Sequence, residues 1–448
     1  MKRALSIAGS DSSGGAGIQA DIKTFSALGL YCSTVITVLT AQNTETISKI
    51  FVTPSEFFRD QLQSTLDDII PDVIKIGVLY EKTIIDIVYN IVSSIKIPVV
   101  LDPILISGTR IKLLKDDDFD DFITKIVPLS LVITPNIYES ERLSGLKISS
   151  EKDQIEAAYK IMELGAKNVI IKGGSILDDK SKVMDILLEK DNSITKILNE
   201  RVKAIDTHGT GCNFSSALAS FLGKEYSMKD SFILTNEYIK KGLYDVDKIG
   251  NGIVVTNPLH KIYENSTKYE ILNELNIQIR VLEELKDFYN LIPETSTNFV
   301  YCLEGPKNYV DVAGILGRLT TLGNKIRAPN IVEFGASIHV ANALIIANQY
   351  NKLHRAAINI KNTDRLLDIC KRKFNCSSYS RKDEDPENKL IEGQSIKWGI
   401  KHALDISPNA EVISHQGDQG KEPMIIVFGR NPNEIVKKIN IILSELKD

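Results

Sequence analysis

The sequence has few cysteines, and none of them belongs to a paired motif. Its 448 residues include five, Cys32, Cys212, Cys302, Cys370 and Cys376, with no CxxC spacing among them. An odd, scattered set favours neither a disulfide framework nor a zinc site. Such usage is typical of a reducing compartment, and we therefore expect a cytoplasmic protein.

Long apolar runs and blocks of like charge are also missing. No stretch reaches the length of a membrane span, and too few apolar residues follow the Met-Lys-Arg start for a secretion signal. Lys and Arg (54) nearly balance Asp and Glu (58), which leaves a net charge of −4. A basic face for nucleic acid is not indicated. We expect neither a membrane nor a nucleic acid as a partner, and the length favours two domains.

Two common nucleotide-binding fingerprints are absent from the first glycine-rich segment. The run ALSIAG, Ala4–Gly9, is strand-like and leads into SDSSGGAG and then a helical pattern that carries Asp21. No Gly-Lys-Ser/Thr closes the loop and the GxGxxG spacing is missing, so it is neither a Walker A loop nor a dinucleotide site. We expect the turn to hold a small polar molecule, with Asp21 as a substrate contact. Tight packing alone is the alternative.

A second glycine-rich loop lies in IDTHGTGCNFSSALASFL, Ile205–Leu222. Gly209 and Gly211 let the backbone turn tightly before Cys212 opens an apolar helix. Free N–H groups and the positive end of the helix dipole suit a transferring phosphoryl group. At a helix start we expect the acidity of the Cys212 thiol to be raised, which suits it to take a proton from an attacking hydroxyl. A small buried cysteine at a helix start is the alternative.

Strand-like and helical runs alternate over residues 1–257. This alternation predicts an α/β fold with a mostly parallel sheet and crossover helices. Asp102, Asn136 and Lys172 each end a strand-like run. Because ligands bind at the carboxyl edge of such a sheet, we expect these polar residues to converge there.

Seven motifs occur in order along the first part of the chain: AGSDSSGGAGIQADIKTFSALG, TAQNT, IKIGVL, LDPIL, ITPNIYE, IKGG and DTHGTGC. The series closely resembles the hydroxymethylpyrimidine/phosphomethylpyrimidine kinases, ribokinase-like enzymes of thiamine synthesis. The resemblance implies a ribokinase-like fold, a homo-oligomer, ATP and Mg²⁺ as cofactors, and two phosphorylations, first of hydroxymethylpyrimidine and then of its phosphate. Cys212 stands where related sugar kinases carry Asp. Because pyridoxal kinases share this thiol, a pyridoxal kinase is the alternative.

Gln42, in the motif TAQNT, is a candidate for recognition of the pyrimidine. Its amide can accept one hydrogen bond and donate another, and an aminopyrimidine presents an exocyclic NH2 group beside a ring nitrogen. The resemblance implies a substrate contact here, with Val78 on the apolar side of the same pocket. An exposed strand-end amide is the alternative for Gln42.

The nucleotide and metal candidates follow three other strand-like runs. A lysine that ends a buried strand needs a partner, and a nucleotide phosphate is a suitable one for Lys172. Asn136 and Thr207 are further candidates for nucleotide contacts. Asp102 and Glu139 are candidates to hold Mg²⁺, directly or through water. Glu139 equally fits a favourable acid in a first helical turn.

The polar segment 257–270 has weak periodicity, and we place the domain boundary there, between domains at 1–257 and 268–448; a helix is expected from residue 271. The second domain contains four motifs: DVAGILGRLT, EFGASIHVANAL, GDQGKEPMI and VFG. They resemble the thiamine-phosphate synthase domain found fused to such kinases. The resemblance implies a smaller α/β domain that joins the pyrimidine diphosphate to thiazole phosphate and releases pyrophosphate. A non-catalytic domain that senses a thiamine intermediate, or one that only dimerises, is the alternative.

Cations around a leaving diphosphate are what this coupling needs. Arg318 and His339 are the candidates for catalysis, because a guanidinium or an imidazolium can bind phosphate oxygens. Lys421, Asp418 and Arg327 are candidates for substrate binding. His339 equally fits a satisfied core histidine, and Lys421 a solvated loop pair with the acid that follows it.

Overall fold

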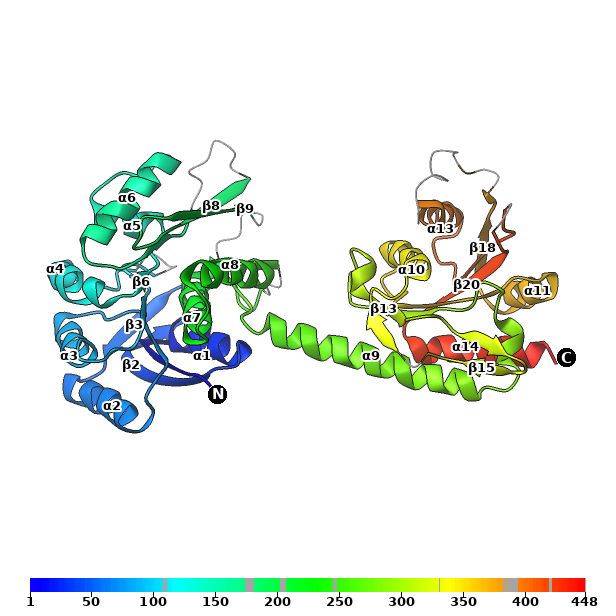
Figure 1. Cartoon of the computed structure of the whole chain (residues 1–448), viewed down its shortest axis with the longest axis horizontal. Helices are drawn as coiled ribbons and strands as arrows, with labels where there is room; N and C mark the ends of the chain where they lie inside the picture. The colour runs from blue at the N-terminus through cyan, green and yellow to red at the C-terminus, as the bar shows by residue number, and fades with distance from the viewer. Residues whose placement is uncertain are drawn as a thin grey trace. The chain divides into compact units, whose positions relative to one another are not determined.

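The computed structural model describes residues 1–107, 111–173, 181–201, 207–244, 248–329, 331–381, 384, 394–418 and 421–447, without the side chain of residue 394. The chain divides into two compact units, Met1–Tyr263 and Glu264–Asp448 (Figure 1). Across the described ranges, none of the helices has the length and apolar character needed to cross a membrane.

The first unit is built on a nine-stranded sheet with the order β3-β2-β1-β4-β5-β6-β7-β8-β9. Its strands are β1 (Arg3–Asp11), β2 (Tyr31–Gln42), β3 (Ile47–Val52), β4 (Val73–Ile76), β5 (Val99–Leu101), β6 (Val132–Ile133), β7 (Val169–Ile171), β8 (Lys182–Leu188) and β9 (Ile194–Glu200). From β2 to β7 neighbouring strands pair in parallel, whereas β3, β8 and β9 pair antiparallel at the edges. The predicted mostly parallel sheet is confirmed.

Helices cover both faces of this sheet (Figure 1). One layer contains α1 (Gly17–Ala27), α7 (Thr210–Gly223) and α8 (Met228–Tyr244), and the other contains α2 (Ser55–Asp68), α3 (Lys82–Val92), α4 (Phe119–Asp121), α5 (Ile137–Ser144) and α6 (Glu151–Glu163). Alternate residues of a strand face opposite layers. Thus Ala4 packs with α1 and α7, whereas Leu5 packs with α2 and α3. The short strand β10 (Thr207–His208) precedes α7, and β11 (Val254–Val255) follows α8. These two strands pair in parallel.

The second unit has a seven-stranded sheet with the order β16-β13-β12-β17-β20-β19-β18. Its elements are α9 (His260–Glu284), β12 (Phe299–Cys302), β13 (Val312–Ile315), the hairpin β14 (Thr320–Leu322) and β15 (Lys325–Arg327), β16 (Val332–Phe334), α10 (His339–Tyr350), β17 (Ala356–Lys361), α11 (Asp364–Lys373), β18 (Cys376–Tyr379), α13 (Gln394–Ile406), β19 (Val412–His415), β20 (Met424–Gly429) and α14 (Pro432–Glu445). The helices α10 and α13 cover one face of the sheet, and α9, α11 and α14 cover the other.

The helix α9 differs from the expectation for the segment 257–270. It begins at His260 rather than at residue 271. No Gly or Pro interrupts the sequence from His260 to Glu284, so helical propensity carries the helix through the polar segment. Periodic burial starts only at Ile271, and this is why the earlier part looked aperiodic.

Candidate active sites

A cavity of about 280 Å³ opens at the carboxyl edge of the first sheet. Its wall contains residues at the carboxyl ends of β1 and β2, the first residue of β3, Lys75 of β4, residues that follow β4, β5, β6 and β7, and the segment from β10 to the start of α7. Of the residues singled out in the sequence, the cavity wall contains Gln42, Val78, Asp102, Asn136, Glu139, Lys172, Thr207, Gly209, Gly211 and Cys212. The parallel topology therefore gathers them at one edge, as we expected.

Asp21 does not reach this cavity, and its prediction as a substrate contact is wrong. Its fully buried carboxylate accepts hydrogen bonds from Ser6 Oγ at 2.6 Å, Ser216 Oγ at 2.7 Å and Lys75 Nζ at 2.9 Å. Since the protein itself satisfies these oxygens, none is left for a ligand. Asp21 instead holds Lys75, whose side chain does line the cavity.

Lys75 is a site residue that the sequence reasoning missed. Burial lowers its pKa, but the charges of Asp21, Cys212 and Asp102 and the hydrogen bond to Asp21 together outweigh burial, and the net pKa is raised. The ammonium is therefore kept charged beneath the cavity. The available signal was a lysine inside the otherwise apolar run VIKIGVL, since a buried strand tolerates a lysine only when it has a partner.

The expected acidity of Cys212 is also wrong for the free protein. Burial raises the pKa of its thiol to about 12, and the nearby charge of Lys75 and the N–H group of Gly17 only partly oppose this. Desolvation of a thiolate outweighs the helix dipole here because the thiol lies beneath the cavity surface. Cys212 is a neutral thiol until a ligand or a reaction changes its surroundings.

The two glycine-rich loops meet at Gly209. This residue caps α7 with a φ of 87°, and a Cβ there would lie 1.9 Å from the carbonyl oxygen of Gly15. Only glycine fits such a backbone position and such a close approach. At Gly211, a Cβ would lie 3.4 Å from Lys172 Nζ, so the missing side chain leaves that side of the residue open to the amine. The start of α7 therefore faces the amine of Lys172.

Two carboxylates lie beside that amine. Asp102 Oδ1 is 3.2 Å from Lys172 Nζ, and Asp102 Oδ2 accepts a hydrogen bond from Ser215 Oγ at 3.1 Å. Glu139 Oε2 accepts the backbone N–H of Asn136 at 2.8 Å and forms the capping box of α5. Burial and the charge of Asp102 raise the pKa of Glu139 to about 7, although the charge of Lys172 partly opposes them.

These two carboxylates suit a cation that also binds a substrate better than a metal site formed by protein ligands alone. The described residues contain no group of three or more His, Cys, Asp or Glu placed to hold a metal. Mg²⁺ usually takes one or two carboxylates together with waters and substrate phosphates. Asp102 and Glu139 therefore fit Mg²⁺ that arrives with a nucleotide. The first-turn position of Glu139, which was the alternative, is also what the structure shows.

A second cavity, of about 300 Å³, adjoins the first and shares Lys172, Thr207 and Thr210 with it. Thr207 Oγ1 lies 2.7 Å from Thr210 Oγ1, so the two hydroxyls form one polar edge between the cavities. The rest of the wall includes Asp185, Asn199, Phe214, Asn236 and Lys240. Two ligands can therefore meet at Lys172.

The second unit has its own cavity, of about 550 Å³. It lies at the N-terminal ends of α10 and α13, and its wall contains the basic residues Arg318, His339, Arg381, His415 and Lys421. Helix N-termini and basic side chains attract anions. The cavity is therefore suited to substrates that carry phosphate groups.

Of the residues predicted for this unit, some line the cavity and others do not: the wall contains Arg318, His339 and Lys421, but not Arg327 and Asp418. Arg318 donates from Nη1 to Thr295 O at 2.7 Å, and His339 is exposed at the first position of α10 rather than buried in a core. Arg327 lies on the exposed hairpin strand β15, outside the cavity wall, so the structure adds no support for its predicted place among the substrate contacts. Asp418 is also absent from the wall; its N–H donates to the carbonyl of Lys421 at 3.0 Å.

The loop that carries Lys421 is held in place by hydrogen bonds to the side chain of Glu422. Glu422 accepts the N–H groups of Glu294 and Thr295, each at 2.9 Å, rather than forming the solvated pair that was the alternative for Lys421. Lys421 instead lines the cavity. The intervening residues 419–420, which belong to the motif GDQGKEPMI, lie outside the described residues.

His415 and Arg381 are site residues that the sequence reasoning missed. His415 ends β19, is buried, and accepts the N–H of Gly417 on Nδ1 at 3.0 Å. Burial, together with the charges of Arg381 and Lys421, lowers its pKa to about 4. A histidine that ends a buried strand just before a glycine-rich loop was the signal.

We expect the second unit to lose stability as pH falls from about 6.5 to about 4. In that range the unfolded state protonates this histidine while the folded His415 stays neutral, so the unfolded state binds more protons. The loss is up to about 3 kcal/mol. Urea unfolding followed by Trp398, the chain's one tryptophan, measures it. His415→Gln should flatten the pH dependence; an unchanged slope would contradict the assignment.

Comparison with protein families gives two matches. Residues 11–257 match the family described as phosphomethylpyrimidine kinase. Residues 274–441 match the family described as thiamine-phosphate synthase ThiN. The first match contains most of the wall of the two adjoining cavities of the first unit, and the second match contains the wall of the cavity of the second unit.

One known protein matches both units, and others match the first unit. The chain is 31% identical over 442 residues to the bifunctional thiamine biosynthesis protein ThiDN of Methanocaldococcus jannaschii, covering 98% of this chain and 97% of that protein. Over 57% of its length it is 36% identical to the hydroxymethylpyrimidine/phosphomethylpyrimidine kinase of Bacillus subtilis, of which it covers 94%. Among solved structures, pyridoxal kinase from Staphylococcus aureus in complex with AMP-PCP and pyridoxal matches with a TM-score of 0.54, 30% identity, and coverage of 58% of this chain and 94% of that one.

Proposed function

The chain belongs to the phosphomethylpyrimidine kinase family and continues into a thiamine-phosphate synthase domain, and on this premise we propose a specific division of the chemistry between its cavities. It is a bifunctional enzyme of thiamine biosynthesis. The kinase half phosphorylates hydroxymethylpyrimidine and then its phosphate. The synthase half couples the diphosphate with thiazole phosphate. A relative matched over nearly its whole length is bifunctional, which favours catalysis over a sensing second domain.

In the kinase half the pyrimidine binds beside Gln42 and Val78, and the nucleotide binds in the adjoining cavity. The junction of the two cavities at Lys172 is the observation that carries this assignment. Use of ATP is supported by similar kinases crystallised with AMP-PCP or ADP. The phosphoryl group then crosses between the cavities in front of the N–H groups of Gly211 and Cys212 at the start of α7.

Asn136, Thr207 and Lys172 bind the nucleotide phosphates, while Asp102 and Glu139 hold Mg²⁺ against them. The metal supplies charge that offsets the phosphate oxygens. Lys172 keeps its charge because Asp102 and Glu139 outweigh the effect of burial on its pKa. It can therefore move from Asp102 toward a phosphate without losing its proton.

In the synthase half, Arg318 and His339 stabilise the departing diphosphate, and Lys421 binds a substrate phosphate. Two anionic substrates must share the cavity, and its basic wall matches their charge. Arg381 and His415 lie at the same wall, and His415 has a hydrogen on Nε2 to donate to a phosphate, because its Nδ1 accepts the N–H of Gly417. A homo-oligomer and a cytoplasmic location stay predictions.

Ending the chain after Tyr263 should leave a folded kinase. The first unit has its own core and both kinase cavities, and its boundary falls at this residue. We expect the truncated protein to convert hydroxymethylpyrimidine to the diphosphate with a kcat within a few fold of the full chain. Phosphate transfer from ATP, followed by separation of the products, measures this. Aggregation, or loss of the second phosphorylation only, would show that the halves depend on each other.

A further inference from the structure

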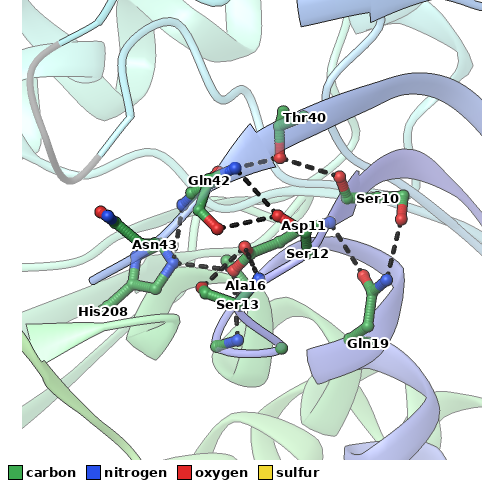
Figure 2. A network of polar contacts seen from close by, with 12 residues as sticks. Ser10, Asp11, Ser12, Ser13, Ala16, Gln19, Thr40, Gln42, Asn43 and His208 are labelled. Carbon is green, nitrogen blue, oxygen red and sulfur yellow. Dashed lines mark hydrogen bonds and ion pairs between the residues drawn. The ribbon is translucent and has the colours of Figure 1, made fainter. Parts of the chain in front are cut away.

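A polar network connects the ends of β1 and β2 with β10 (Figure 2). In it, His208 Nε2 lies 2.9 Å from Asp11 Oδ2 and 3.0 Å from the Nε2 position of Gln42. On the other side of the amide, Thr40 Oγ1 lies 3.1 Å from the Oε1 position of Gln42 and 3.0 Å from Ser10 O. The Gln42 amide therefore lies between an imidazole and a hydroxyl.

Asp11 determines which ring nitrogen of His208 carries a proton. Its carboxylate already accepts hydrogen bonds from Ser13 N, Ser13 Oγ, Gly15 N and Ala16 N, at 2.7 to 3.1 Å. Such a group is an acceptor only. Although burial raises its pKa, the hydrogen bonds from His208, Ser13 and Ala16 outweigh this and hold it at about 2. His208 Nε2 must therefore carry a hydrogen and donate it.

An Nε2–H group cannot also accept from an amide NH2. With the Gln42 nitrogen facing the ring, two donors would meet at 3.0 Å. This conflict at His208 disappears if the oxygen and nitrogen of the amide exchange places, since the two ends have the same shape.

We propose that Asp11 and His208 are positioning residues that hold the carbonyl oxygen of Gln42 toward the imidazole and its NH2 group toward Thr40, and that this fixed order selects an aminopyrimidine substrate. The proposal rests on the pyrimidine-binding role of Gln42 proposed above. The one hydrogen on His208 Nε2 is shared between Asp11 Oδ2 and Gln42 Oε1, Gln42 Nε2 donates to Thr40 Oγ1, and Thr40 donates to Ser10 O. Every hydrogen in the chain then has an acceptor.

The fixed amide has one lone pair and one N–H group left for the cavity. A substrate with an exocyclic NH2 beside a ring nitrogen satisfies both, with its NH2 on the His208 side and its ring nitrogen on the Thr40 side. The analogue with oxygen in place of that NH2 presents a carbonyl beside a ring N–H, which is the reverse pattern. Since a site built for one pattern leaves buried groups unpaired with the other, rejection by about a hundredfold or more is expected.

The first test reads the proton on His208 in the ligand-free full-length protein. Nitrogen-15 NMR of labelled histidines distinguishes Nε2–H from Nδ1–H, and only six histidines contribute. The His208→Gln spectrum assigns the signal by its loss. We expect Nε2 of His208 to be protonated at pH 7 to 8. A neutral ring with the proton on Nδ1 would overturn the proposal, whether or not the protein is a kinase.

The second test compares hydroxymethylpyrimidine with its oxo analogue as kinase substrates. Thr40→Val removes the acceptor that holds the Gln42 NH2 group, whereas Thr40→Ser keeps it and serves as the matched control. In the Val variant the ratio of kcat/KM values, amine over oxo, should fall at least about tenfold, because the amide can turn to suit either substrate. A merely structural role would lower both values alike. An unchanged ratio in Thr40→Val would contradict the proposal.

Discussion

Replacing Cys212 with alanine should slow the phosphorylation of hydroxymethylpyrimidine by roughly a hundredfold or more, the range of a lost general base. Phosphorylation of the resulting monophosphate should change only a few fold. The alcohol must lose a proton as it attacks, whereas a phosphate monoester, with a second pKa of about 6, is already largely an anion at neutral pH. Separate assays with the two purified substrates give the two rates.

The raised pKa of Cys212 adds a dependence on pH. Because burial holds its pKa at about 12, the thiolate fraction grows throughout the neutral and mildly alkaline range. The first phosphorylation should therefore become faster from pH 7 to 10 in the native enzyme, and Cys212→Ser, which keeps the size of the side chain, should lose this rise. Equal losses in both phosphorylation steps would exclude Cys212 as the base.

Replacing Arg318 or His339 with alanine should reduce formation of thiamine phosphate by roughly a hundredfold or more, while the kinase rates stay unchanged. Negative charge builds on the diphosphate oxygen as its bond to the pyrimidine methylene breaks. Donors whose bonds strengthen as this charge develops lower the barrier, and loss of one such donor costs about 10²–10³ in kcat. The two sites belong to separate units.

The chain offers a matched control for these variants. Arg327 has the same chemistry as Arg318 but lies on the exposed hairpin, outside the cavity. Arg327→Ala should keep nearly full synthase activity. If Arg318→Ala and His339→Ala are also fully active, other cations of the wall, Arg381 and Lys421, carry the reaction instead. If the native enzyme forms no thiamine phosphate and the variants only bind an intermediate more weakly, the domain is a sensor.

Sequence patterns were sufficient to predict which residues lie at the carboxyl edge of the first sheet, but not which side chains contact each other beneath that edge. Lys172 and Asp102 could be placed because each ends a strand of a parallel sheet, and all such ends meet at one edge. Asp21 could not, because a helix position does not reveal whether its side chain faces a cavity or a buried partner. That partner, Lys75, lies on another strand, and only the fold brings the two together.

The acidity of Cys212 illustrates a second limit. Its position at a helix start was readable, but the balance between the dipole and desolvation depends on burial, which requires the packed structure. His415 was missed for a similar reason, since its neighbour Arg381 comes from another segment of the chain. Periodicity also failed at α9, where exposed residues precede the buried face.

The most direct measurement supplies the purified full-length chain with hydroxymethylpyrimidine, ATP, Mg²⁺ and thiazole phosphate and follows the products by chromatography. Two complete sites on one chain should yield thiamine phosphate and pyrophosphate without any added synthase. Accumulation of the pyrimidine diphosphate without thiamine phosphate would contradict the catalytic role of the second unit. Absence of any phosphorylated pyrimidine would contradict the account of the first.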